Sequence, residues 1–164
     1  MDMKPARMTN DILQRALFEI PDGIAQIYSN TVYGTVEFFD YLKGTLILYE
    51  LMNLPQKTGG IFGFHIHEGN SCLNDTAVPY EKTGEHFNPA NQVHPYHLGD
   101  LPPVFANNGY AWGLIYIDKF QVKDINHHTL VLHEHVDDLH SQPSGNSGTK
   151  IACGEIRIFS KEVQ

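Results

Sequence analysis

Residues 32–52 read VYGTVEFFDYLKGTLILYELM, two runs rich in β-branched and aromatic residues with Asp40 and Gly44 between them. Such runs favour β-strands, and aspartate and glycine are typical turn residues. The pattern recurs along the chain, at residues 25–28, 32–39, 45–52, 61–67, 103–106, 111–117, 129–134 and 151–159. These short strands, with turn residues between most of them, predict an all-β antiparallel sandwich or barrel.

The remaining segments predict how the chain is organised around these strands. With 164 residues, we expect a single domain over residues 1–164. Residues 1–22 form an N-terminal extension, in which residues 9–17 could make a short amphipathic helix. Residues 69–101 and 136–150 show no sustained period, and each follows a histidine-bearing strand. Loops of this length inside a compact domain are usually functional.

Charge and hydropathy limit the possible partners. The formal net charge of −8 disfavours nucleic acid or an anionic membrane surface as a partner, because both would repel the chain. No apolar run approaches the roughly 20 residues needed to span a bilayer. Charged residues are mixed with apolar ones throughout residues 1–17, and a signal peptide does not have this pattern. We therefore expect a cytoplasmic protein, or an extracytoplasmic one if a prepeptide has been removed, that acts on a small molecule.

Histidine is unusually frequent, with ten residues that fall mainly between positions 65 and 97 and between 127 and 140. His65 and His67 are two apart on a predicted strand, so both can point to one metal ion. A pair of surface imidazoles is the alternative. His133 ends the apolar run 129–132 and, alone, would more often be a core residue. Together with His65 and His67 it offers a third nitrogen, which suits copper.

A second cluster lies within the first long loop, where prolines and a glycine allow the backbone to fold around a centre. Three imidazole nitrogens and one carboxylate oxygen would complete a tetrahedral zinc site without an open position, as in structural zinc sites. The candidate ligands are His86, His94, His97 and Asp100. A solvated, histidine-rich loop is the alternative interpretation of the same residues.

Seven short motifs follow one another between residues 63 and 154. They are GFHIHE at 63–68, GEHFNP at 84–89, HLGDL at 97–101, LHE at 132–134, DD at 137–138, GNSG at 145–148 and IACG at 151–154. In these motifs the chain resembles the copper/zinc superoxide dismutase family, in its bacterial type, over roughly residues 24–160. The resemblance implies an eight-stranded antiparallel Greek-key β-barrel with two long functional loops.

The resemblance also implies a role for each matching residue. The copper ligands would be His65, His67, His86 and His133. The zinc ligands would be His86, His94, His97 and Asp100, so that His86 bridges copper and zinc. Asp137 would link a copper ligand to a zinc ligand by hydrogen bonds, and Cys72 and Cys153 would form a disulfide. The remaining histidines match no ligand and are expected on the surface; they are His127, His128, His135 and His140.

The implied activity is the disproportionation of superoxide to O₂ and H₂O₂ by Cu(II)/Cu(I) cycling, with His86 and Lys150 as catalytic residues. Lys150 stands where the family has an arginine. Lysine keeps the positive charge but lacks the planar two-pronged donor, which predicts slower turnover. The expected partner is superoxide alone, in a homodimer or a monomer, since Arg157 stands where the eukaryotic dimer surface carries a small residue.

Two other functions compete with this one. A protein that keeps the barrel and the ligands but turns over superoxide poorly or not at all would fit Lys150 and a second loop that is shorter than in the eukaryotic enzymes. A zinc hydrolase would need Glu68 or Glu85 as a general base. The hydrolase is disfavoured because the chain has no His-Glu-x-x-His motif, and the predicted zinc site has no open position.

Overall fold

A computed structural model of the protein describes residues 5–56 and 59–159. In these residues, seven strands form one antiparallel sheet in the order β5-β8-β9-β1-β2-β3-β7, and β4 pairs with β6 in a second, small sheet. The elements are α1 Pro5–Phe18, β1 Gly23–Tyr28, β2 Tyr33–Tyr41, β3 Gly44–Met52, β4 Ile61–Phe62, β5 Phe64–His67, η2 Glu81–Thr83, β6 Val104–Phe105, β7 Tyr110–Ile117, η3 Val122–Ile125, β8 Thr129–His133 and β9 Lys150–Ile158.

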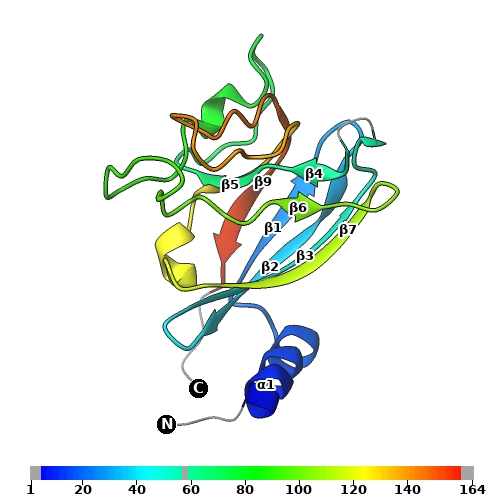
Figure 1. The fold of residues 1–164 in the computed structure, drawn as a ribbon, viewed down its shortest axis with the longest axis vertical. Helices are drawn as coiled ribbons and strands as arrows, with labels where there is room; N and C mark the ends of the chain where they lie inside the picture. Colours follow the sequence, from blue (N-terminus) through cyan, green and yellow to red (C-terminus); the bar gives the residue numbers. More distant parts are fainter. Residues whose placement is uncertain (1–4, 57–58, 160–164) are drawn as a thin grey trace.

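The large sheet curls, and β4 and β6 lie across its open side (Figure 1). β3 and β7 are neighbours although three strands separate them in the sequence, and β8 returns to pair with β5. Such crossing connections are those of Greek-key folds. The predicted antiparallel β-barrel class is therefore confirmed, and the predicted strands are found with ends shifted by at most two residues, with one exception.

The exception is the predicted strand 61–67, which is two strands divided at Gly63. Phe62 pairs with Val104 of β6, whereas Phe64 pairs with Leu132 of β8, so the chain changes sheets at this point. Gly63 is buried, and a Cβ there would lie 2.9 Å from the hydroxyl oxygen of Ser147. A glycine at a sheet corner permits this close approach.

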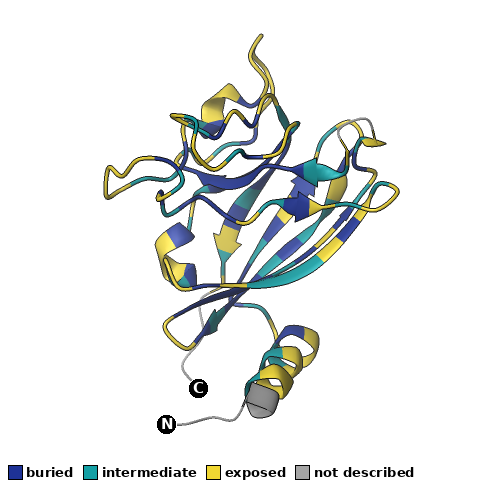
Figure 2. Cartoon of the chain, viewed as in Figure 1, coloured by how far each residue is buried: buried dark blue, intermediate teal, exposed yellow. Residues whose placement is uncertain are grey.

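The hydrophobic core fills the space between the large sheet and the β4/β6 pair. Buried and exposed residues alternate along parts of several strands, for example along β1 (Figure 2). Phe38, Phe62 and Phe64 are completely buried in this core. Each such side chain contributes about 1.5–3 kcal/mol by leaving water. Phe64 and Ile66 point into the core, so their neighbours His65 and His67 face the other way.

The N-terminal helix covers residues beyond the predicted 9–17. α1 begins at Pro5, a residue that is tolerated in the first turn of a helix because its missing N–H would have no partner there. Ile12 packs against buried residues of β2 and β3, while Phe18 is exposed.

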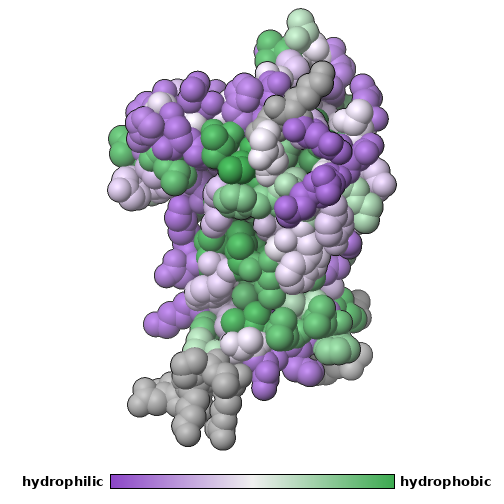
Figure 3. All heavy atoms as spheres, turned by 45° about the vertical axis from the view of Figure 1, so that its right-hand side comes forward, coloured by the Kyte–Doolittle hydropathy of each residue, from purple (hydrophilic) through white to green (hydrophobic). Residues whose placement is uncertain are grey.

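Figure 3 shows other apolar side chains on the middle and lower part of the face that it displays. Among the described residues, no helix has the length and apolar character to cross a membrane.

Two long connections are placed at one end of the molecule. Residues 68–103 join β5 to β6 and contain η2, and residues 134–149 join β8 to β9. Figure 1 shows both at the end of the barrel opposite α1. β5, β8 and β9 are adjacent in the large sheet, where the first loop follows His67 of β5 and the second joins the paired residues His133 and Lys150. The predicted metal-binding residues are therefore carried by adjacent elements.

Candidate metal centre

Three of the predicted copper ligands come from the neighbouring strands β5 and β8. The two strands pair in antiparallel register, and His65, His67 and His133 are all buried. The Nε2 atoms of His67 and His133 face each other at 3.1 Å. The ring centroids of His65 and His133 are 4.8 Å apart. The strand pairing thus brings together residues that are 66 positions apart in the sequence.

The first long loop folds back onto β5 and adds a fourth imidazole. His86 forms an isolated β-bridge with His67, and Asp100 forms one with His65. A Cβ on Gly99 would collide with the carbonyl oxygen of Ile66, so this approach requires glycine. The His86 ring lies 4.0 Å from that of His65 and 4.9 Å from that of His67, centroid to centroid. The residue expected to bridge the two metals therefore lies beside both β5 histidines.

The other side of His86 faces the predicted zinc ligands. Its Nδ1 lies 2.7 Å from Asp100 Oδ1. The Nδ1 atoms of His94 and His97 each lie 3.2 Å from Asp100 Oδ2. Four ligands around zinc at about 2.0 Å would be roughly 3.3 Å from one another in a tetrahedron. The spacing of these four side chains therefore suits a tetrahedral zinc ion.

Buried nitrogen atoms without a hydrogen-bond partner test whether metals fit this centre. Among the described residues, such atoms include Nδ1 of His65, Nε2 of His86 and Nδ1 of both His94 and His97. A buried polar atom without a partner is costly, and nearly all such atoms in proteins are satisfied. Two groups of four side chains offer one ligand atom each: His65, His67, His86 and His133, and His86, His94, His97 and Asp100. Within each group, these four atoms all lie within 4.8 Å of one another. The donors fit two adjacent metal ions, a nitrogen-only site for copper and a mixed site for zinc.

Asp137 connects the two groups by hydrogen bonds. Its carboxylate accepts a 2.7 Å hydrogen bond from His65 Nε2 and a 2.9 Å bond from His94 Nε2. Burial alone raises the pKa of this carboxyl group, but the bonds from His65, the Leu139 N–H and His94 outweigh it and hold the pKa well below its usual value. Since both Nε2 atoms must donate, both Nδ1 atoms keep lone pairs for a metal.

Gly145 allows this carboxylate to be enclosed. Its φ is +66°, and a Cβ at this position would collide with the Asp137 side chain. The motif GNSG at 145–148 therefore has a steric role beside the metal centre. A larger residue here would displace the carboxylate that orients two of the rings.

The imidazoles of His65, His67 and His133 are held in the neutral form that metals bind. Burial lowers the pKa of His65 to about 4, although the bond to Asp137 opposes this shift. Burial, together with the neighbouring imidazoles, also lowers the pKa values of His67 and His133 well below the usual value. Ring nitrogens that stay unprotonated near neutral pH are available as ligands.

We expect the metal-free protein to lose stability as the pH falls from about 6.5 to about 4. In this window the unfolded chain binds protons at these histidines and the folded chain does not, so the stabilisation present above the unfolded pKa disappears. His65 alone accounts for about 3 kcal/mol of the loss. Urea unfolding of the metal-free protein at a series of pH values measures it.

The matched control is His127→Gln, which removes an exposed imidazole and should leave the pH profile unchanged. A free energy of unfolding that stays constant between pH 6.5 and 4 would contradict the buried neutral state of these rings.

Lys150 is the first residue of β9 and is half-buried beside the first long loop, residues 68–103. Its ammonium donates 2.8 Å hydrogen bonds to Thr83 Oγ1 and to the Gly84 carbonyl oxygen. That carbonyl also accepts a bond from His67 Nδ1, which leaves His67 Nε2 free to face His133. The sequence did not indicate these roles of Thr83 and Gly84, because nothing in a lone Thr-Gly pair signals a contact with a residue 66 positions away.

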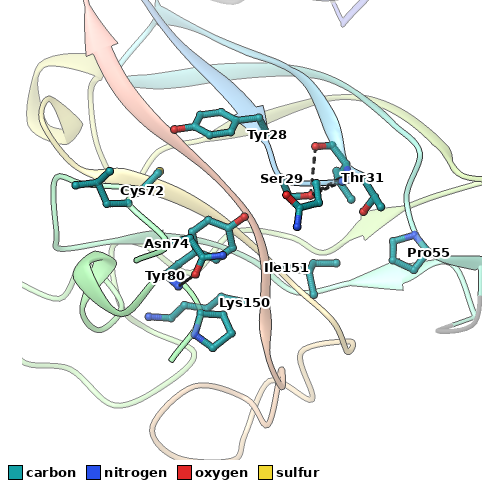
Figure 4. Close-up of a pocket in the computed structure, with 13 residues that line it drawn as sticks. Tyr28, Ser29, Thr31, Pro55, Cys72, Asn74, Tyr80, Lys150 and Ile151 are labelled. Atoms are coloured by element: carbon teal, nitrogen blue, oxygen red, sulfur yellow. Dashed lines mark hydrogen bonds between the residues drawn. The ribbon is translucent and has the colours of Figure 1, made fainter. Parts of the chain in front are cut away.

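Two cavities lie near the centre, and only one reaches its ligands. A cavity of about 650 Å³ is lined by Lys150, Tyr28, Asn74 and Tyr80 among others, but by no predicted metal ligand (Figure 4). A second cavity, of about 360 Å³, is lined by both His86 and His97, together with Glu68 and Glu85. Of these two cavities, the second is therefore the one that reaches His86.

The disulfide between Cys72 and Cys153 is present, as predicted, and no other cysteine exists. It joins the first long loop to β9, where Cys72 and Cys153 are buried with Tyr80 and Val131.

The histidines expected on the surface behave as predicted, with one qualification. His127, His135 and His140 are exposed. His128 is half-buried: its ring lies 4.1 Å from that of Phe87, and its Nδ1 donates to the Glu68 carbonyl oxygen. Its contact with Phe87 places it against the first long loop, which the sequence did not indicate.

Fold and site together define a Greek-key β-barrel protein in which two adjoining groups of side chains, each able to hold a metal ion, share His86. The copper/zinc superoxide dismutase (SODC) family model matches residues 32–156. The chain belongs to the copper/zinc superoxide dismutase family.

Relatives in several bacteria agree with this assignment. A superoxide dismutase [Cu-Zn] of Photobacterium leiognathi is 30% identical over 138 residues, covering 76% of this chain and 78% of that protein. The corresponding protein of Actinobacillus pleuropneumoniae is 32% identical, covering 80% of this chain and 75% of its own length. The superoxide dismutase-like protein YojM of Bacillus subtilis is also 32% identical, but over 61% of this chain and 57% of its own length.

Proposed function

We propose that this protein disproportionates superoxide, converting two superoxide ions and two protons to O₂ and H₂O₂. Copper would be held by His65, His67, His86 and His133, and zinc by His86, His94, His97 and Asp100. The observation that carries the proposal is the position of the His86 ring. One of its nitrogens is buried without a partner next to the β5 histidines, and the other lies 2.7 Å from Asp100.

Each group of side chains has a task in this reaction. Copper, when bound, would supply one-electron chemistry, and zinc held by His86, His94, His97 and Asp100 would supply a fixed positive charge. His86 Nε2 can hold a proton whenever it is free of metal, and can return it to the peroxide that forms. Asp137 keeps the rings of His65 and His94 in one orientation and one tautomer. The half-buried ammonium of Lys150 provides local positive charge for an anion in a protein whose net charge is −8.

The test is made on one sample of purified protein, loaded with both metals. Elemental analysis should find one copper and one zinc per chain, and the copper EPR spectrum should show nitrogen ligands. The same sample should remove superoxide at a rate proportional to its copper content. A fully loaded protein that does not accelerate superoxide loss would overturn the proposed activity while leaving the metal sites intact.

A second candidate is a metal-binding protein of the same family with little or no turnover. Lys150 favours it, because two of the three ammonium protons are directed to Thr83 and Gly84. YojM, a relative, is itself described as superoxide dismutase-like. The assay above separates the candidates, since only the dismutase removes superoxide.

Exchange of Lys150 for alanine is expected to lower the rate constant for superoxide by about ten-fold, because a positive charge beside the site attracts the anion. Lys150→Arg keeps the charge and should stay closer to the parent. The rate constant is measured on samples with equal copper and zinc contents. Lys123→Ala, which removes an exposed lysine of η3, is the matched control. If Lys150→Ala turns over superoxide as fast as the parent, Lys150 does not guide the anion.

A further inference from the structure

Lys119 connects the barrel to the loop that carries two of the proposed zinc ligands. The residue lies between β7 and η3, in a segment that the motifs at the metal centre do not include. Its ammonium donates hydrogen bonds of 3.1 Å to the carbonyl oxygen of His97 and 3.0 Å to that of Asp100. One side chain thus contacts both ends of the turn formed by residues 97–100.

The turn itself is closed by its own short contacts. The His97 N–H donates to Asp100 Oδ2 at 3.0 Å, and the Asp100 N–H donates to the His97 carbonyl oxygen at 3.3 Å. His97 Nδ1 and Asp100 Oδ2, which would both contact zinc, are 3.2 Å apart. Any widening of the turn would therefore separate two ligand atoms directly.

The segment that carries Lys119 is firmly placed. Its neighbour Phe120 is buried, and the Phe120 carbonyl oxygen accepts a buried 3.0 Å bond from the hydroxyl of Thr45. The next residues are held by a bond from the Val122 N–H to Asp40 Oδ1. These contacts tie the base of Lys119 to β2 and β3, whereas the turn at 97–100 belongs to a long loop. The ammonium can therefore fix the turn relative to the barrel.

We propose that Lys119 is a positioning residue for the zinc site, acting through the backbone of His97 and Asp100. This inference rests on the proposed zinc site. Loss of a side chain that orients a metal ligand typically lowers the affinity for the metal about 10-fold to 100-fold. A positive charge near zinc would by itself weaken binding, so the two effects of this side chain have opposite signs. The direction of the change on mutation shows which effect dominates.

The experiment measures the zinc dissociation constant of the full-length, copper-free protein by competition with a chromogenic chelator. Lys119→Met, which keeps the length of the side chain and removes the ammonium, should weaken zinc binding about ten-fold. Lys119→Arg retains donors and charge and should recover most of the loss. Lys123→Met removes the same charge from an exposed side chain of η3 and should leave the constant near that of the parent.

Thermal unfolding of the metal-free proteins accompanies the titrations. If Lys119→Met binds zinc as tightly as the parent or more tightly, or if Lys123→Met loses as much affinity, the positioning role is wrong. The same holds if Lys119→Met unfolds well below the parent and Lys119→Arg recovers the melting temperature but not the affinity. A parent protein that takes up no zinc would overturn the zinc site itself, a different result.

Discussion

Replacement of His86 by alanine is expected to reduce superoxide turnover by about 100-fold or more, the range lost when a general acid or base is removed. The exchange removes three things at once: a nitrogen beside His65 and His67, a nitrogen 2.7 Å from Asp100, and a carrier for one of the protons that peroxide needs. Turnover is measured on samples whose copper and zinc contents have been determined, so that lost metal is not mistaken for lost catalysis.

A second measurement tests the bridge itself. In the parent, removal of zinc should change the copper EPR spectrum, because one imidazole would contact both ions. In His86→Ala the spectrum should no longer respond to zinc. His128→Ala is the matched control, since His128 is a half-buried histidine that contacts Phe87, next to His86, and belongs to neither group. A metal-loaded His86→Ala protein with the turnover of the parent would refute the shared ring.

Much of the fold could be predicted from local pattern because the strands are bounded by strong turn residues. The run 45–52 and strand β3, Gly44–Met52, differ by one residue at one end. The division at Gly63 could not be foreseen, because both halves have strand-like sequences and the break depends on their different partners, β6 and β8. Pairing partners are a property of the tertiary structure, and they decided this boundary.

The candidate site shows the same distinction. His65 and His67 share a face by strand geometry alone, so their proximity follows from the sequence. The contacts that other elements make with the metal-binding residues do not follow from the sequence in this way. Lys119 and Thr83 act on the backbone or on another side chain across elements that no periodicity connects. Only the arrangement of the loops over the barrel brings them to the metal-binding residues.

Removal of the disulfide is expected to be the largest single loss of stability. The bond joins residues 81 positions apart, and a loop of this length restricts the unfolded chain by about 4–5 kcal/mol in the chain-entropy model. The Cys72→Ala, Cys153→Ala double variant should lose about this free energy of unfolding. Urea unfolding of the metal-free proteins, without reductant, measures the difference. The parent treated with reductant is the control and should lose a similar amount.

The loss should also reach the metal centre, because the disulfide fixes the segment that ends at Gly84. Residues 73–83 lie between Cys72 and the carbonyl that holds both His67 and Lys150. Without the disulfide the segment that ends at this carbonyl loses its covalent link to β9, so copper affinity should fall in the same variant, measured by chelator competition. A double variant with less than about 1 kcal/mol lost, below the usual range for a native disulfide, would contradict the chain-entropy argument. Unchanged copper affinity would show that the carbonyl keeps its place without the bond.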